Sequence, residues 1–189
     1  ENPSDDITQA LRITRQVAEA LQVAHKHGIT HRDIKPSNIM IDTKGRVKVM
    51  DFGLARHGES DIQLTEPGMY IGTPKYSSPE QCETKSIDQR SDLYSLGVIL
   101  YELLSGQAPH QANTPMALMH QIIYEAPVDI RTLKKELPEP VCALLEGLLV
   151  KKPDNRTQSA AELISAINEI LGETDNQGLV AAKPNRSKW

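Results

Sequence analysis

The pattern of apolar and polar residues predicts a long helix near the start of the chain. Over residues 7–27, apolar side chains recur at steps of three and four, as at Ile7, Leu11 and Val17. This spacing places them on one face of an α-helix, and Gly28 is a typical stop signal.

The period then shortens, and residues 38–50 predict a β-hairpin. The segments NIMID and RVKVM are short and rich in β-branched residues, and DTKGR between them contains residues that favour a turn. Residues 52–80 show no sustained period and contain several glycines and prolines. We expect a long loop there, and long loops in compact domains are usually functional or disordered.

Helices are predicted over most of the remaining chain. Residues 90–106, RSDLYSLGVILYELLSG, are apolar almost all round, which is typical of a buried central helix. Amphipathic segments follow at 114–127, 138–150 and 159–172.

The predicted fold is therefore a mainly α-helical domain with a short β-hairpin. It covers residues 1–171, and its last helix begins with Ser159 and Glu162 at the spacing of a capping box. Residues 172–189 are polar and aperiodic, so we expect a tail or linker there.

Composition and charge favour a soluble globular protein. The 189 residues are 39% hydrophobic and 24% charged, which is typical of a packed domain. The formal charge of -4 argues against binding nucleic acid through bulk charge. Cys82 and Cys142 are too few for a disulfide scaffold and lack the spacing of a zinc site, so we expect reduced thiols in a cytoplasmic protein.

No segment is predicted to span a membrane. The most apolar run, LYSLGVILYELL, is shorter than the roughly 18 residues required and contains Glu102. The first residues, ENPSDDI, lack an initiator Met, a basic region and an apolar run. We interpret the chain as a piece of a longer protein, which a segment beyond Trp189 would anchor to a membrane if such a segment exists.

The stretch HRDIKPSN, His31 to Asn38, concentrates polar chemistry between the first helix and the first strand. Pro36 restricts Lys35 to an extended backbone, which stiffens the loop. Because a hairpin brings its outer ends together, Asp51 is expected to return close to Asn38 and Asp33. Two carboxylates and an amide are oxygen ligands that suit Mg²⁺, and a lysine beside them suits a phosphate. The alternative is a solvated turn.

The order of these residues resembles that of protein kinases. H-R-D-x-K-x-x-N followed by D-F-G is similar to their catalytic and metal-binding loops. GTPKYSSPE resembles the end of an activation segment, with Ser78 where Ala is usual, and KKPDNRT resembles a closing arginine motif. The likeness runs from about residue 7 to 171, and RSDLYSLGVILYELLSG is most similar to bacterial Ser/Thr kinases.

The resemblance implies catalytic and cofactor-binding roles. Asp33 would accept the proton of the substrate hydroxyl, and Lys35 would neutralise the transferring phosphoryl group. Asn38 and Asp51 would hold Mg²⁺, or Mn²⁺ in its place, beside ATP. Met40 would lie under the adenine, although a core methionine is nearly as good an interpretation.

The resemblance also implies structural and regulatory roles. His31 and Phe52 would belong to a hydrophobic stack, and Asp92 would accept hydrogen bonds from the backbone of His31 and Arg32. Glu80 and Arg156 would form a buried ion pair. Arg32 would pair with a phosphate on the loop, for which Thr65 is the first candidate; Thr73 is a second candidate with a mainly structural role.

The sequence contains neither the glycine-rich loop nor the V-A-I-K strand of a kinase N-terminal lobe. We therefore expect the C-terminal lobe of an ATP-dependent Ser/Thr kinase that acts on protein hydroxyls, with little activity without its missing N-terminal lobe. One alternative is a non-catalytic interaction or regulatory module. Another is a small-molecule phosphotransferase, which Lys35 and GTPKYSSPE disfavour.

Overall fold

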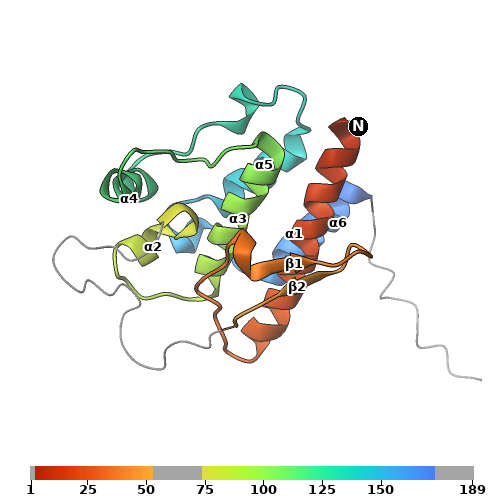
Figure 1. The fold of residues 1–189 in the computed structure, drawn as a ribbon, viewed down its shortest axis with the longest axis horizontal. Helices are drawn as coiled ribbons and strands as arrows, with labels where there is room; N and C mark the ends of the chain where they lie inside the picture. Colours follow the sequence, from red (N-terminus) through yellow and green to blue (C-terminus); the bar gives the residue numbers. More distant parts are fainter. Residues whose placement is uncertain (1–2, 53–73, 173–189) are drawn as a thin grey trace, which may run out of the picture.

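The computed structural model of the chain describes residues 3–52 and 74–172. Thr65, Thr73 and the predicted tail from residue 173 onward lie outside the described residues. The described part is mainly helical and contains one two-stranded antiparallel sheet (Figure 1), which confirms the predicted fold class. None of its helices combines the length and the apolar character needed to cross a bilayer.

The first helix, α1, extends over Pro3–Lys26 and begins four residues before the predicted start. Proline is tolerated at the first helical position because its missing N–H has no partner there in any helix. The helix ends as predicted, since Gly28 adopts a left-handed φ of 73°. Its apolar face, with Leu11 and Val17 almost fully buried, packs on the core.

The predicted hairpin is confirmed as β1, Ile39–Ile41, paired antiparallel with β2, Val47–Val49. In the turn, the carboxylate of Asp42 accepts the N–H groups of Lys44 and Arg46. The side chain of Gln16 on α1 accepts from the Val47 N–H and donates to the Gly45 carbonyl. The hairpin is therefore fastened along α1, with its two ends directed toward the loop that follows that helix.

The predicted central helix is α3, Gln89–Ser105, and it is buried on nearly all sides. Asp88 caps its first turn by accepting the Arg90 N–H, and Gly106 ends it with a left-handed φ of 79°. The helices α5, Glu139–Leu148, and α6, Ala160–Leu171, complete the main core with α1. Figure 1 shows α1 and α3 side by side, with α6 behind α1.

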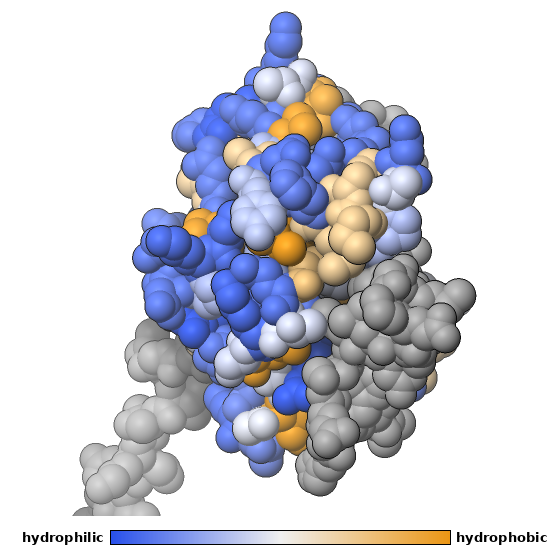
Figure 2. All heavy atoms as spheres, turned by 90° about the vertical axis from the view of Figure 1, so that its left-hand side faces the viewer, coloured by the Kyte–Doolittle hydropathy of each residue, from blue (hydrophilic) through white to orange (hydrophobic). Residues whose placement is uncertain are grey.

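A second side of the molecule is formed by the short helix α2, Pro79–Cys82, and by α4, Pro115–Tyr124. They enclose a small separate cluster of Cys82, Leu118 and Ile122 (Figure 1). Viewed from this side, apolar side chains form separate spots among hydrophilic ones rather than one continuous patch (Figure 2). The described residues also form short 3-10 helices η1 to η4, at Pro36–Asn38, Pro74–Tyr76, Ile130–Thr132 and Pro153–Asn155.

Two local predictions need correction. The loop predicted over residues 52–80 already contains η2 and the start of α2 in its last part, because prolines and the Ser78 cap favour short helical turns there. At α6, the hydroxyl of Ser159 accepts the Glu162 N–H, but the Glu162 carboxylate accepts from Gln158, one residue before the cap. The predicted capping box at α6 is therefore only half formed.

Candidate active site

Asp92, a buried residue in the first turn of α3, holds the loop between α1 and β1 through hydrogen bonds. The two oxygens of Asp92 accept the backbone N–H groups of His31 at 2.9 Å and Arg32 at 2.8 Å. The ring of His25 adds a contact of 2.8 Å. These bonds hold Arg32 at a φ of 68°, a left-handed conformation that non-glycine residues rarely adopt.

His31 is buried and is bonded through both ring nitrogens. Its Nε2 lies 2.8 Å from the carbonyl oxygen of Met50, so this nitrogen carries the proton, and Nδ1 accepts the Asp33 N–H at 3.3 Å. The ring packs edge-on against Phe52 with centroids 4.9 Å apart. The ring therefore ties the loop to the end of β2 and is not free to act as a base.

Asp33, Lys35 and Asn38 meet at the surface. The carboxylate oxygen Oδ2 of Asp33 lies 2.8 Å from Lys35 Nζ and 3.1 Å from the amide nitrogen of Asn38. Asn38 is buried, and it also donates to the Asp33 carbonyl at 2.8 Å. By contrast, the side chain of Asp33 is 60% exposed. Its carboxylate is therefore held in place by Lys35 and Asn38 and remains accessible to solvent.

The hairpin returns the backbone at Asp51 to the neighbourhood of Asn38. Ile39 pairs with Val49, and the Met50 N–H donates to the Asn38 carbonyl at 2.8 Å. Asp51 follows directly, exposed and with a φ of 58°, which turns the chain out of β2. The backbone thus places Asp51 beside Asn38. Met40 lies on β1 with 56% of its surface exposed, on the same hairpin.

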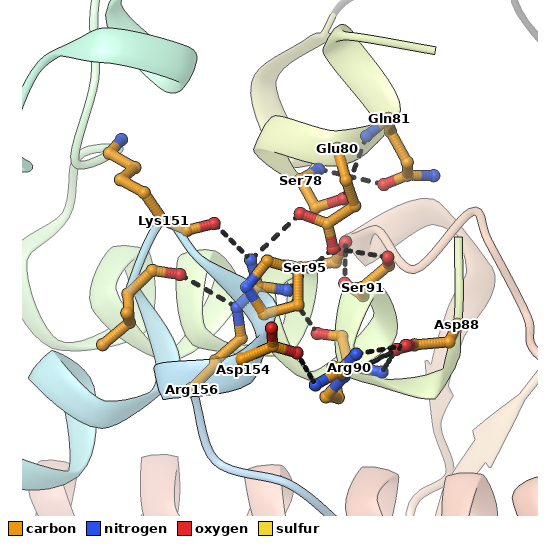
Figure 3. Close-up of polar contacts among 12 residues, drawn as sticks. Ser78, Glu80, Gln81, Asp88, Arg90, Ser91, Ser95, Lys151, Asp154 and Arg156 are labelled. Atoms are coloured by element: carbon orange, nitrogen blue, oxygen red, sulfur yellow. Dashed lines mark hydrogen bonds and ion pairs between the residues drawn. The ribbon is translucent and has the colours of Figure 1, made fainter. Parts of the chain in front are cut away.

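Glu80 and Arg156 form an enclosed ion pair (Figure 3). Arg156 donates to both oxygens of the Glu80 carboxylate, at 2.8 and 3.0 Å, and Ser91 also donates to Glu80. The remaining N–H groups of Arg156 donate to the carbonyls of Val150, Arg90 and Lys151. All five donors of the guanidinium are therefore satisfied, which a buried arginine requires. The pair fastens α2 to the segment before α6.

The family pattern described as the protein kinase domain matches residues 4–167. This chain belongs to the protein kinase family. It is 42% identical to the serine/threonine-protein kinase PknB of Mycolicibacterium smegmatis, over 93% of this chain and 30% of that protein. Within the family, the chain is of the bacterial Ser/Thr type.

Other relatives have the same character. A probable serine/threonine-protein kinase of Streptomyces coelicolor is 41% identical, over 92% of this chain and 27% of the relative. One of Clostridium acetobutylicum is 36% identical, over 90% of this chain and 26% of the relative. The chain therefore spans less than a third of the length of these relatives.

Protein kinases generally use ATP and Mg²⁺, and the oxygen atoms of this site fit such an ion. Within the described residues, no group of three or more His, Cys, Asp or Glu side chains gathers around a point. Mg²⁺ does not need one, since it is commonly held by one or two carboxylates together with substrate phosphates and water. The amide of Asn38 and the carboxylate of Asp51, on backbone segments that the hairpin brings close together, are donor groups of this kind and would hold the ion.

Burial and ion pairing together set the pKa values of two buried groups, the Glu80 carboxyl and the Cys82 thiol. Burial by itself raises the pKa of Glu80, but the hydrogen bonds and charge of Arg156 outweigh it, so the pKa lies below its ordinary value of 4.5. Burial raises the pKa of the Cys82 thiol to about 12, so this cysteine stays protonated. Both Cys82 and Cys142 are buried free thiols.

Two groups of polar contacts were not predicted from the sequence. Lys75 and Tyr76 both bond to the carboxylate of Glu102 on α3, at 2.5 and 2.7 Å, and this contact raises the pKa of Lys75. Gln81 on α2 closes a capping box with Ser78. The spacing S-x-x-Q before a helix signals such a box. The residue that departs from the family pattern, Ser78, is thus the helix cap.

Proposed function

We propose that this chain carries the catalytic loop of a Ser/Thr kinase that transfers the γ-phosphoryl group of ATP to hydroxyl groups of proteins. The observation that carries this proposal is the Asp33 carboxylate, which lies 2.8 Å from Lys35 Nζ and 3.1 Å from Asn38 Nδ2 and remains 60% exposed. A carboxylate held in one direction but open to solvent is suited to receive a substrate hydroxyl.

Each residue then has a distinct task. Asp33 accepts the proton of the attacking hydroxyl and directs its oxygen toward the phosphorus. Lys35, already paired with Asp33, adds positive charge where the transferring oxygens become negative. Asn38 and Asp51 would hold Mg²⁺, which neutralises the phosphates of ATP when bound. Met40 on β1 would support the adenine.

The hairpin side of the molecule supports a further part of the proposal, the N-terminal kinase lobe as partner. Met40, Ile41 and Met50 are 56%, 49% and 41% exposed, although they are large and apolar. A lobe placed over them would bury this surface and enclose ATP from the other side. Since phosphoryl transfer depends mainly on positioning and charge, we expect these 189 residues alone to bind ATP weakly and to turn over little.

Regulation by phosphorylation remains part of the proposal. Arg32 is exposed and directly precedes Asp33, and the ring of the neighbouring His31 packs against Phe52. A phosphate on Thr65, or on Thr73, would find a guanidinium there for charge-assisted hydrogen bonds. Both threonines lie outside the described residues, so this role rests on the sequence resemblance and on the exposure of Arg32.

The test is an assay of the gene product that contains this chain and the residues that adjoin it. With ATP, Mg²⁺ and a Ser/Thr protein substrate, Asp33→Asn is expected to lower kcat by about 10²- to 10⁴-fold. The matched control is Asp154→Asn, because Asp154 is 89% exposed and its ion pair is with Arg90, not with Asp33, Lys35 or Asn38. Absence of transfer by the unmodified protein would favour the non-catalytic module, and transfer to an aminoglycoside alone would favour the small-molecule enzyme.

A further inference from the structure

Gln81 uses both ends of its amide at once. The side-chain oxygen Oε1 accepts the Ser78 N–H at 2.9 Å, and the backbone N–H of Gln81 donates to the Ser78 hydroxyl. These two bonds together cap α2. The Nε2 of Gln81 donates to the carbonyl of Arg32 at 2.7 Å. Figure 3 shows Glu80 pointing from α2 toward Arg156, while the amide of Gln81 points away from that pair. One side chain thus joins α2 to the catalytic loop.

The carbonyl that Gln81 contacts belongs to the peptide unit just before Asp33. The N–H of the same unit, that of Asp33, donates to His31 Nδ1 at 3.3 Å. Asp92 holds the preceding unit through the Arg32 N–H. The Arg32–Asp33 peptide is therefore bonded at both ends, and it follows a residue whose φ of 68° is unfavourable without such support.

We propose that Gln81 is a positioning residue, which fixes the plane of the Arg32–Asp33 peptide and thereby the direction of the Asp33 carboxylate. Rotation of this peptide would turn Asp33 away from Asn38 and Lys35. The proposal rests on the proposed function of Asp33 in phosphoryl transfer. It assigns to α2 a direct contact with the catalytic loop, independent of the Glu80–Arg156 pair.

The chemistry of the amide explains why this position suits glutamine. Oε1 is occupied by the cap, so the N–H₂ group remains as the donor for Arg32. A glutamate would keep the cap and place an oxygen against the carbonyl of Arg32. A lysine would keep a donor for that carbonyl and lose the acceptor for the cap. The two substitutions separate the roles of the side chain.

The first measurement is amide hydrogen exchange of the 189-residue chain. Gln81→Glu is expected to speed exchange at Arg32 and Asp33 by about three- to tenfold, the effect of losing one hydrogen bond of ordinary strength. The matched control is Gln89→Glu, because Gln89 also donates to a distant carbonyl, that of Gln158, but does not touch the loop. Exchange in the control is expected to stay within about twofold of the unmodified chain.

The second measurement is kinetic, on the kinase-active gene product. Gln81→Glu is expected to lower kcat by about 10- to 100-fold with the KM for ATP little changed, since a small displacement of a catalytic group has this effect. Gln81→Lys is expected to retain more of kcat than Gln81→Glu but to be less stable, because an acidic residue suits a helix N-terminus better than a basic one.

A purely capping role predicts the reverse order, with Gln81→Glu the more active variant, and this order would overturn the proposal. Unchanged exchange at Asp33 in Gln81→Glu would overturn it as well. If the unmodified protein transfers no phosphate, the proposed function fails, whereas the exchange data still decide whether Gln81 orients this peptide.

Discussion

Gly97 of α3 lies directly against Leu148 of α5. A Cβ atom built on Gly97 would stand 2.7 Å from the Cβ of Leu148 and 3.3 Å from a methyl carbon of Leu149. Real Cβ atoms do not approach so closely, so the two helices meet at a distance that only glycine permits. This contact sets the separation of the central helix from the helix that covers it.

Gly97→Ala is therefore expected to destabilise the protein, by about 1–3 kcal/mol, the usual cost of overpacking a core. The control is Gly147→Ala on α5, where a Cβ would meet the nearest atom, Thr157 Oγ1, at 3.4 Å. The control is expected to be neutral or stabilising, because alanine favours helices over glycine. Urea denaturation measures both, and equal effects of the two substitutions would contradict the prediction.

The Glu80–Arg156 pair supplies a second prediction. Arg156→Leu leaves the buried Glu80 carboxylate without its partner, and we expect a loss of about 3–5 kcal/mol in the free energy of unfolding. Replacing both residues, as Glu80→Met with Arg156→Leu, is expected to recover part of this loss.

The control for this pair is Arg131→Leu. Arg131 also contacts two glutamates, Glu139 and Glu146, but at the surface, where such pairs contribute about 1 kcal/mol or less. The prediction would be contradicted if Arg156→Leu lowered the free energy of unfolding as little as Arg131→Leu does. Such a result would mean that the Glu80 carboxylate is not left as an unpaired buried charge. Chemical denaturation at pH 7 is the measurement.

His110 makes stability depend on pH. It is buried with Nε2 2.9 Å from Lys151 Nζ, and burial followed by the lysine charge lowers the pKa of His110 from 6.5 to about 4. Between these values the unfolded chain binds a proton that the folded protein does not. The free energy of unfolding should therefore fall as pH falls from 6.5 toward 4.

The variant His110→Gln keeps an acceptor for Lys151 and removes the titration. We expect its urea midpoint to change less between pH 7 and pH 5 than that of the unmodified protein. The comparison variant is His120→Gln, which replaces an exposed histidine far less enclosed than His110. A parallel fall in the unmodified protein and in His110→Gln would show that other groups cause it.

Asp92 supplies the last prediction. Asp92→Asn replaces one acceptor oxygen by an N–H₂ group, so the N–H of either His31 or Arg32 loses its partner. We expect a loss of about 1–3 kcal/mol, the cost of an unsatisfied buried donor, and lower kinase activity. Asp88→Asn, at the N-cap of the same helix, should cost less, because asparagine is an equally good N-cap and the ion pair with Arg90 that it weakens is partly exposed. Thermal unfolding of both variants measures the two losses of stability, and equal losses would contradict the prediction.

Much of the fold could be predicted because its signals are local. The stops at Gly28 and Gly106 and the turn at Asp42 depend only on neighbouring residues, so the helix ends and the hairpin lie where expected. The return of Asp51 to Asn38 follows from the pairing of two adjacent strands. The short helix α2 was missed, since four residues carry too weak a period to be separated from a loop.

The amino-acid sequence by itself determined the long helices and both strands, the order of the catalytic-loop residues and membership of the kinase family. These depend on periods, caps and motifs within a few residues. Only the tertiary structure decided that Gln81 reaches the carbonyl of Arg32 across 49 positions, and that Gln89 reaches the carbonyl of Gln158 across 69. Such contacts arise when packed helices bring distant backbone groups within bonding distance, and no short-range pattern records which donor meets which acceptor.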